Sequence, residues 1–420
     1  MSNVDTQYEI KFLLDANQVL TDKHTWRTEL VHLEQSEGQQ IDIRFIDTPE
    51  QDFFRDNWIL RARLKPNKDQ WEITYKKRFN FSEGQDLQQV MDHAKELGFN
   101  LEDPTYKQEV DWSGADRTFD LSYEVKAKIV QEENLDEWRG ILNENAPPML
   151  KTQKWGERDF SAILTETRVL GPITALKYKG QWDGIQESVE IWTVAGNSIV
   201  EISTEATGLE AAESSHRTME GLLSQQNLLP IQHKISKTRW AMDIIQHPAK
   251  RGDPFSLLLQ GGFNLYFRHA RPVGGNGDED PLSELGKTQA RQLGEILRNK
   301  KIPLQIPVLS SPVMRALQTA VLAFPNEGEV ITDERLPSVD ELQQVLEVKP
   351  ELGTNQVLVA HYHTFKDQLQ EFLDHLGLVI LQPLGTGQGY RIIRQLDILQ
   401  ASLVKYGSGV IEPAASNDNH

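Results

Sequence analysis

Basic residues follow three strand-like segments in the C-terminal part of the chain. One apolar segment ends in Arg268 and His269, a second is followed by Arg315 on a helical segment, and a third ends at His361. Ligands of open α/β sheets bind at the carboxyl ends of the strands. Phosphoryl transfer through a histidine needs a neutral imidazole nucleophile, guanidiniums that hold the phosphoryl oxygens, and a further charge-stabilising group. These residue types at three strand ends therefore predict a phosphoryl-transfer site.

Two other interpretations of these histidines remain open at this point. A histidine at a strand end is also compatible with a purely structural role. The pair His361 and His363 could indicate metal ligation, because residues two apart in a strand share a face. We expect His363 to open the following helix and to face elsewhere.

The four segments together resemble the histidine phosphatase superfamily. The matching stretches are RHA at 268–270, LSELGKTQARQLGEIL at 282–297, SSPVMRALQTA at 310–320 and VLVAH at 357–361. The resemblance implies that His269 accepts the phosphoryl group, that Arg268 and Arg315 bind phosphate, and that His361 is the second histidine of the pocket. It implies no cofactor for this part of the chain.

The sequence departs from that family at two points. Ala270 stands where the family usually has glycine. The acidic proton donor of many members has no counterpart in frame, since Glu334 is out of register and only Asp340 and Glu341 remain as candidates. Short members lack this acid and favour substrates with good leaving groups, such as phosphohistidine. Hydrolysis is therefore expected rather than mutase activity.

Charged residues alternate along strand-like segments of the N-terminal part. On an open sheet this alternation is an ordinary solvated face. Several such faces together are also compatible with a barrel whose charged lumen binds an elongated polyanion, with carboxylates that hold a divalent cation bridging its phosphates. The alternating sets are Glu9 with Lys11, Arg61 with Arg63, Glu72 with Lys76, Lys177 with Lys179, and Glu201 with Glu205.

This pattern resembles the CYTH (triphosphate tunnel metalloenzyme) family. Gln7-x-Glu9-x-Lys11 matches its opening ExExK signature, and FIDTP at 45–49, LRARL, WEITYKK, IVEIS at 199–203 and SKTR at 236–239 follow in order. Two carboxylates of the pattern are missing, at Gln7 and Ser203, and the affinity of such metal sites depends on ligand charge. The resemblance implies a phosphate-binding set of Lys11, Arg61, Arg63, Lys76, Lys177 and Arg239, and Mg²⁺ or Mn²⁺ on Glu9, Glu201 and Glu205.

The elements that must position these residues divide the chain in two. Strand-like segments with a few helices up to residue 247 predict an α+β domain with an antiparallel β-barrel or tunnel. Alternating strands and helices after residue 260, among them helix 364–376, predict an α/β three-layer sandwich with a mainly parallel sheet. We expect domains at 1–247 and 261–405, a linker at 248–260 and a tail at 406–420. The predicted N-terminal helices are Leu87–Leu97, Leu135–Asn143 and Leu209–Leu223.

Composition narrows the function classes further. The 420 residues carry a net charge of −18, which disfavours general nucleic-acid binding. The chain has no cysteine, so disulfides, thiolate metal sites and cysteine nucleophiles are excluded. No apolar run reaches the roughly 20 residues that span a bilayer, and no secretory signal is visible at the start. We expect a cytoplasmic protein without membrane association.

Three functional interpretations follow. The first is a phosphohydrolase with two sites, in which the N-terminal domain binds, and also cleaves, a triphosphate or polyphosphate with a divalent metal. In the second, that domain is a non-catalytic sensor of a polyphosphorylated ligand that regulates the phosphatase. In the third, both domains are inactive scaffolds, which the complete set of His269, Arg315 and His361 argues against. The substrate class is a phosphorylated small molecule or nucleotide.

Overall fold

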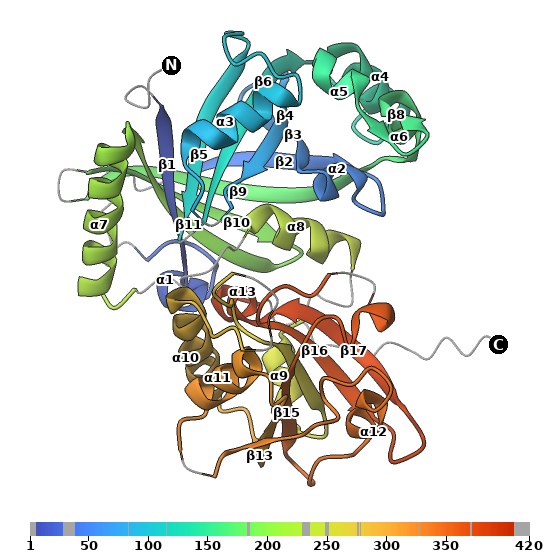
Figure 1. Cartoon of the computed structure of the whole chain (residues 1–420). Coiled ribbons are helices and arrows are strands. Elements are labelled where there is room, and N and C mark those ends of the chain that lie inside the picture. Colours follow the sequence, from blue (N-terminus) through green and yellow to red (C-terminus); the bar gives the residue numbers. More distant parts are fainter. Residues whose placement is uncertain are drawn as a thin grey trace. The chain divides into compact units, whose positions relative to one another are not determined.

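The chain folds into two compact units, which Figure 1 shows in a computed structural model. Unit 1 holds the described residues from 6 to 247, and unit 2 holds those from 252 to 406. No helix among the described residues is long and apolar enough to cross a membrane. The structure describes residues 6–27, 38–82, 84–114, 116–182, 185–228, 236–247, 252–274, 277, 279–326, 328–369 and 372–406. Residues 248–251 of the predicted linker and 407–420 of the predicted tail lie outside this set.

Unit 1 is a closed barrel of nine strands, as predicted. The order around the barrel is β1-β11-β10-β9-β2-β3-β4-β6-β5, and β5 closes it by pairing with β1. That last pairing is parallel, whereas all the others are antiparallel. The strands are β1 (Gln7–Leu14), β2 (Gln39–Asp47), β3 (Trp58–Leu64), β4 (Trp71–Asn80), β5 (Tyr106–Ser113), β6 (Asp116–Ala127), β9 (Arg168–Trp182), β10 (Ile185–Val194) and β11 (Asn197–Thr207).

The apolar faces of these strands point outward and are covered by helices. On β1, Tyr8, Ile10 and Phe12 are buried in the outer core, and Phe12 contacts His216 of α7 (Leu209–Gln225) with ring centroids 5.0 Å apart. The period-two alternation therefore turns the intervening polar residues toward the lumen. The other elements are α1 (Ala16–Val19), α2 (Asp52–Arg55), α3 (Leu87–Glu96), α4 (Leu135–Asn145), α5 (Pro148–Thr152), β7 (Lys154–Trp155), β8 (Arg158–Asp159), α6 (Phe160–Glu166) and α8 (Lys237–Gln246).

Strand β5 contains none of the alternating charged sets that were identified in the sequence. It lies in the middle of unit 1, where the sequence pattern is least regular. Its outward face carries Tyr106, Val110 and Trp112, but Gln108 interrupts the apolar series. Because β5 completes the barrel, its inward residues become part of the lumen.

Unit 2 is a six-stranded sheet between helices. The order is β14-β13-β15-β12-β16-β17; the first four strands are parallel, and β16 and β17 are antiparallel to their neighbours. Helix α11 packs on β13 and β15 and against α10, which contacts α13, and α12 packs over Tyr266 and Leu358 on the other face. The elements are α9 (Pro254–Leu258), β12 (Asn264–Arg268), α10 (Glu284–Asn299), β13 (Leu304–Ser310), α11 (Met314–Ala323), β14 (Val330–Thr332), α12 (Leu342–Leu346), β15 (Asn355–Ala360), β16 (Gly377–Pro383), β17 (Tyr390–Asp397) and α13 (Ile398–Leu403).

Two local predictions differ from the structure of unit 2. Part of the predicted linker 248–260 forms helix α9, which Asp253 caps and which buries Phe255 and Leu258. The Asp-Pro pair there begins a helix rather than marking a flexible connection. The predicted helix 364–376 is a single 3₁₀ turn at Lys366–Gln368 among the described residues. The chain becomes extended at Leu369 instead of continuing as a helix.

Two glycines let helix α10 lie close to its neighbours. A Cβ on Gly286 would overlap the carbonyl oxygen of Arg271, in the segment that follows His269. A Cβ on Gly294 would overlap the carbonyl oxygen of Ala323 at the end of α11. The packing of α10 against α11 therefore depends on the missing side chain at Gly294.

We predict that Gly294→Ala destabilises unit 2 by about 1–3 kcal/mol, because the new methyl group forces backbone apart in a packed interface. Gly140→Ala is the matched control, since Gly140 is an exposed glycine in α4 with open space around it. It should stabilise the protein by about 0.4–1 kcal/mol through the unfolded chain. Calorimetric unfolding of both variants measures the two effects, and a higher melting temperature for Gly294→Ala would contradict the close packing.

Candidate functional sites

His269 lies directly after β12, at the carboxyl end of the parallel strands. Its backbone N–H donates to the carbonyl of Ala360 at 3.0 Å, which ties it to the end of β15. Its side chain is 5% exposed. Nδ1 lies 2.8 Å from the carbonyl oxygen of Ala270, and because a carbonyl only accepts, Nδ1 carries the proton. Nε2 is therefore the unprotonated nitrogen, and it accepts a 3.1 Å hydrogen bond from Nε of Arg315.

The surroundings of His269 keep its ring neutral. Burial lowers its pKa to about 3. The hydrogen bond to Ala270 opposes this shift, and the nearby groups His375, Arg268 and Arg315 lower the pKa further. An imidazole with this pKa is unprotonated at neutral pH. It is therefore available as a nucleophile.

Arg315 is held in place by the elements around it. It begins the first turn of α11, and one of its terminal nitrogens donates to the carbonyl of Gly277 at 2.8 Å. The hydroxyl of Thr319 accepts from the N–H of Ala270 at 3.0 Å and donates to the carbonyl of Arg315 at 2.7 Å. Thr319 thus connects the loop after His269 with the helix that carries the arginine.

His361 and Arg268 each present a buried nitrogen without a hydrogen-bond partner. His361 follows β15, its ring centroid lies 5.4 Å from that of His269, and its Nε2 is hydrogen-bonded to Oγ of Ser311 at 2.8 Å. Its Nδ1 is buried and unpartnered, as is Nε of Arg268. Burial, followed by the influence of His269, lowers the pKa of His361 to about 3. Two unsatisfied polar groups beside a nucleophile are suited to hold an oxyanion.

Arg268 is further oriented by the segment before β16. It donates to the carbonyl of Leu373 at 2.8 Å. Its guanidinium lies over the rings of Phe372 and Tyr362, 5.1 and 5.8 Å from their centroids. Aromatic faces of this kind stabilise and orient a guanidinium. The structure thus brings together all four residues predicted for this site.

His375 is a further residue of this site that the sequence patterns did not indicate. Its ring centroid lies 5.3 Å from that of His269, and its Nδ1 lies 3.3 Å from the carbonyl oxygen of His269. It comes just before β16, and because β16 is antiparallel to β12, the start of β16 lies beside the end of β12. A prediction that β16 runs antiparallel beside β12 would have indicated His375, because the residues before β16 then lie near the end of β12. The three carboxylates considered as proton donors, Glu334, Asp340 and Glu341, are all exposed.

A polar cavity of about 220 Å³ lies in the lumen of unit 1. Residues of several strands and of α8 line it, and most of them are charged. Five of the six predicted phosphate-binding residues are among them. The lining consists of Glu9, Lys11, Arg61, Arg63, Lys76, Arg78, Lys107, Glu109, Asp111, Ser113, Asp116, Thr118, Ser122, Glu124, Lys177, Glu190, Glu201, Glu205, Ser236, Lys237 and Thr238.

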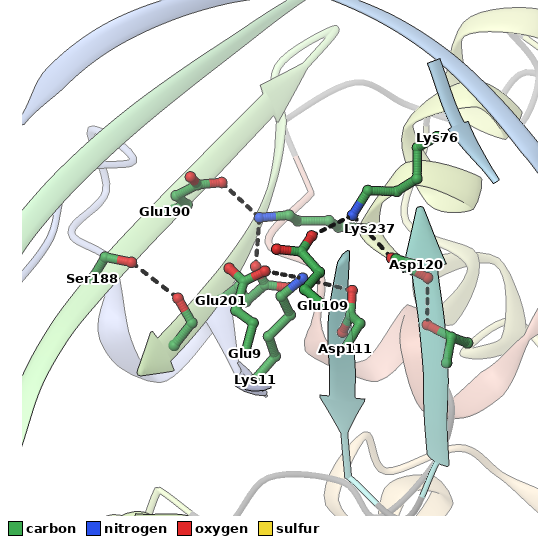
Figure 2. A network of polar contacts seen from close by, with 12 residues as sticks. Glu9, Lys11, Lys76, Glu109, Asp111, Asp120, Ser188, Glu190, Glu201 and Lys237 are labelled. Atoms are coloured by element: carbon green, nitrogen blue, oxygen red, sulfur yellow. Dashed lines mark hydrogen bonds and ion pairs between the residues drawn. The ribbon is translucent and has the colours of Figure 1, made fainter. Parts of the chain in front are cut away.

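Three lysines of the cavity each lie between two carboxylates, as Figure 2 shows. The carboxylates come from five strands that are consecutive around the barrel, so the ion pairs connect nearby strands, and Lys237 connects α8 with two of them. The pairs are Lys11 with Glu9 at 2.8 Å and Asp111 at 2.6 Å, Lys76 with Glu109 at 2.8 Å and Asp120 at 2.9 Å, and Lys237 with Glu190 and Glu201 at 2.6 Å each.

These pairs keep the buried groups ionised. Burial alone would lower the pKa of Lys11, but Asp111 and Glu9 raise it well above its ordinary value. Burial would likewise raise the pKa of Glu109, but Lys76 and Lys107 lower it. A buried charge without such a partner would instead neutralise.

Arg61 and Arg63 differ from the other cations of the cavity. Neither forms an ion pair within the described part of the chain, and the Nε atom of each is buried without a hydrogen-bond partner. Burial, followed by the neighbouring charge of Arg63, lowers the pKa of Arg61 to about 9. Glu190 and Glu124 oppose this shift without an ion-pair contact. Two adjacent guanidiniums that lack such a contact are a place for an anion that accepts hydrogen bonds from both.

One predicted phosphate-binding residue lies elsewhere. Arg239 is not among the residues that line the cavity, whereas Lys237 of the same helix is. Positions two apart on an α-helix point in nearly opposite directions. The rule that residues two apart share a face holds for the strands and not for α8.

The sequence analysis did not assign several other lumen residues to the site. The cations are Arg78 of β4, Lys107 of β5 and Lys237 of α8, and the carboxylates lie on β5, β6 and β10. Alternation of Lys107, Glu109 and Asp111 with apolar positions is the signal that could have revealed β5 and its inward face. The SKTR segment at 236–239 contains Lys237, but its place in the lumen depends on how α8 packs.

The carboxylates predicted to hold a divalent cation do not form a fitting donor set. Glu9 contacts Lys11, Glu201 contacts Lys237, and Glu205 lies exposed at the edge of the cavity. At the two positions where a carboxylate is missing, Gln7 bonds Thr207 and Ser203 bonds Ser188. No group of three or more acidic or histidine side chains suited to a metal ion occurs within the described ranges.

Comparison with known protein families finds a match in the C-terminal part of the chain. Residues 266–341 match the model of the histidine phosphatase superfamily (branch 1). No curated protein matches the chain. The match covers His269 and Arg315 and ends before His361.

Several solved structures are similar to parts of the chain. SixA from Agrobacterium tumefaciens is 17% identical over 32% of this chain and 97% of its own, with a TM-score of 0.27. A histidine phosphatase SixA complexed with tungstate is 15% identical over 32% of this chain and 97% of its own, with a TM-score of 0.28. HpAC1 from Hippeastrum, described as having a dominant triphosphatase activity, is 18% identical over 55% of this chain and 92% of its own, with a TM-score of 0.31.

We predict that the imidazole of His269 does not titrate between about pH 8 and about pH 5, whereas an unperturbed histidine has its midpoint near 6.5. As pH falls, protonation is delayed because the pKa is lowered, so the neutral form persists. Nitrogen-15 NMR of the histidine rings measures this directly, with His269→Gln identifying the signal. The urea-unfolded chain is the reference, and a midpoint near the unfolded value in the native protein would contradict the burial of the ring.

Proposed function

We propose that unit 2 is a histidine phosphatase that hydrolyses a phosphoester or phosphoramidate through a phosphorylated His269. The observation that carries this proposal is the arrangement around Nε2 of His269. An unprotonated nitrogen there is surrounded by the Arg315 guanidinium and by the unpartnered nitrogens of Arg268 and His361. The superfamily match over residues 266–341 supports the same activity.

The reaction proceeds in two displacements. In the first, the lone pair of His269 Nε2 forms a bond to phosphorus while the bond from phosphorus to the leaving group breaks; the leaving group keeps the bonding electrons and takes a proton from solvent. In the second, water attacks the phosphohistidine and releases a proton to solvent, the P–N bond breaks, and inorganic phosphate leaves while Nε2 regains its lone pair. Arg268, Arg315 and His361 hold the phosphoryl oxygens in both steps.

The site favours substrates with good leaving groups. The three carboxylates considered as proton donors are exposed, and the groups around His269 are histidines and arginines. A leaving group that departs with little help from an acid, such as the imidazole of phosphohistidine, suits this arrangement. We therefore propose hydrolysis of such phosphoryl compounds rather than a mutase reaction.

We further propose that unit 1 binds a polyphosphorylated anion and acts as a sensor for the phosphatase. Arg61 and Arg63 lack carboxylate partners, whereas the cavity lysines Lys11, Lys76 and Lys237 are paired, so the two arginines can accept an added anion. Cleavage of a triphosphate with Mg²⁺ or Mn²⁺ is the other candidate. The donor set in the cavity does not favour it.

We predict that His269→Ala lowers phosphatase turnover by on the order of 10³-fold or more, because removal of a covalent nucleophile abolishes both displacements. Rapid quench with a labelled phosphoramidate or activated phosphomonoester should trap acid-labile, base-stable label on the wild type and none on the variant. His93→Ala, which removes an exposed histidine of α3, is the control and should retain the label. Full turnover by His269→Ala would refute the proposed mechanism.

We predict that tripolyphosphate raises the thermal stability of the full chain through unit 1. At a hundredfold excess over the Kd, binding to the native state contributes about 2.7 kcal/mol. Arg61→Glu with Arg63→Glu should abolish the shift in melting temperature. Arg55→Glu with Arg217→Glu reverses two exposed charges of unit 1 and should leave it unchanged. Absence of a shift in the wild type would refute anion binding by unit 1.

A further inference from the structure

We propose that unit 1 binds its anion without a divalent cation, because Lys237 occupies the position between Glu190 and Glu201 that a cation would bridge. The proposal rests on anion binding by unit 1 and adds the source of the positive charge. The ammonium group of Lys237 is 2.6 Å from a carboxylate oxygen of each glutamate. It thus makes, with one charge, the contacts that a metal ion would make (Figure 2).

The position of Lys237 is fixed from several sides. It is the first residue of α8, whose N-cap is Ser236, and α8 packs on β9 and β10. Its ammonium lies 4.7 Å from the centroid of the Trp192 ring, and Nε1 of Trp192 donates to Glu190 at 3.1 Å. The lysine and the glutamate that it contacts are therefore oriented by the same indole.

Charges in the ion-pair network balance without a metal ion. Burial would lower the pKa of Lys237, but Glu190 and Glu201 raise it, so the lysine stays charged. Around it, every carboxylate of the network contacts a lysine or arginine. The carboxylates are Glu9, Glu109, Asp111, Asp120, Glu190 and Glu201, and the cations are Lys11, Lys76, Arg78, Lys107, Lys177 and Lys237.

This balance decides which ions the cavity accepts. A divalent cation would have to displace an ammonium that already neutralises its ligands, which costs the ion pairs it replaces. An anion has no ion pair to displace at Arg61 and Arg63 in the described part of the chain, because Glu190 and Glu124 act on Arg61 only from beyond contact distance. The cavity is therefore built to add negative charge at the arginines and to exclude positive charge at the glutamates.

Titration of the full chain with Mn²⁺, followed by electron paramagnetic resonance, tests the cation side of the proposal. Removing the ammonium frees two carboxylates, and affinity for divalent ions rises with ligand charge. Lys237→Met should therefore bind Mn²⁺ at least about tenfold more tightly than the wild type. Lys77→Met is the matched control, because Lys77 lies outside the cavity and donates to the carbonyl of Asp56. It should behave like the wild type.

The outcomes that overturn the proposal are distinct. Equal Mn²⁺ affinity of the wild type and Lys237→Met would show that the lysine does not block a cation site. If circular dichroism shows that Lys237→Met is unfolded, Lys237→Gln removes the charge and keeps a hydrogen-bonding side chain, and the same comparison applies.

Calorimetric titration with tripolyphosphate tests the anion side. The Kd should agree within about twofold between EDTA and magnesium buffers, once free tripolyphosphate is corrected for its magnesium complex, because the arginines alone supply the charge. Loss of binding in EDTA alone would overturn the metal-independent site. Absence of binding in both buffers would overturn the anion site of unit 1 itself.

Discussion

Burial of charge inside a closed barrel is the constraint on which unit 1 depends. Closure gives each strand one face toward the lumen, and the outer face must carry the apolar core. A charged side chain on the inner face is costly unless a partner of opposite charge lies within contact distance. The lumen satisfies this requirement by placing each of three lysines between two carboxylates from different strands. The same contacts connect nearby strands of the barrel, and α8 with two of them, so electrostatic pairing and barrel geometry support each other.

Unit 2 meets the same constraint in the opposite way. The rings of His269 and His361 lie among positive groups, and no carboxylate within the described ranges forms an ion pair with either. Burial therefore keeps these imidazoles neutral. In unit 1, ion pairs offset the effect of burial and keep the lysines and glutamates charged. Unit 2 thus provides a neutral nucleophile, and unit 1 provides a charged lumen. Each outcome follows from whether an opposite charge accompanies the buried group.

Sequence patterns predicted those features that depend on neighbours in the chain. Strand faces follow from alternation, which identified Arg61 and Arg63, and the motif after β12 identified His269 because the strand and the loop are contiguous. Features that depend on packing between distant segments were not visible. His375 reaches the site only because β16 pairs with β12, and Lys237 reaches the lumen only through the position of α8. No local pattern encodes either arrangement.

The two missing carboxylates of the N-terminal pattern fit the same balance. Ser203 is buried and lies between Lys11 and Ser188 in the barrel register, where its hydroxyl bonds that of Ser188. A glutamate at this position would add a buried negative charge beside a network whose cations are already engaged. Gln7, opposite Thr207 at the end of β1, likewise keeps its site neutral. With neutral groups at these two positions, the six carboxylates of the ion-pair network are matched by its six cations. Arg61, Arg63, Glu124 and Glu205 line the cavity outside this network. The two guanidiniums are therefore the positive groups that remain for an added anion.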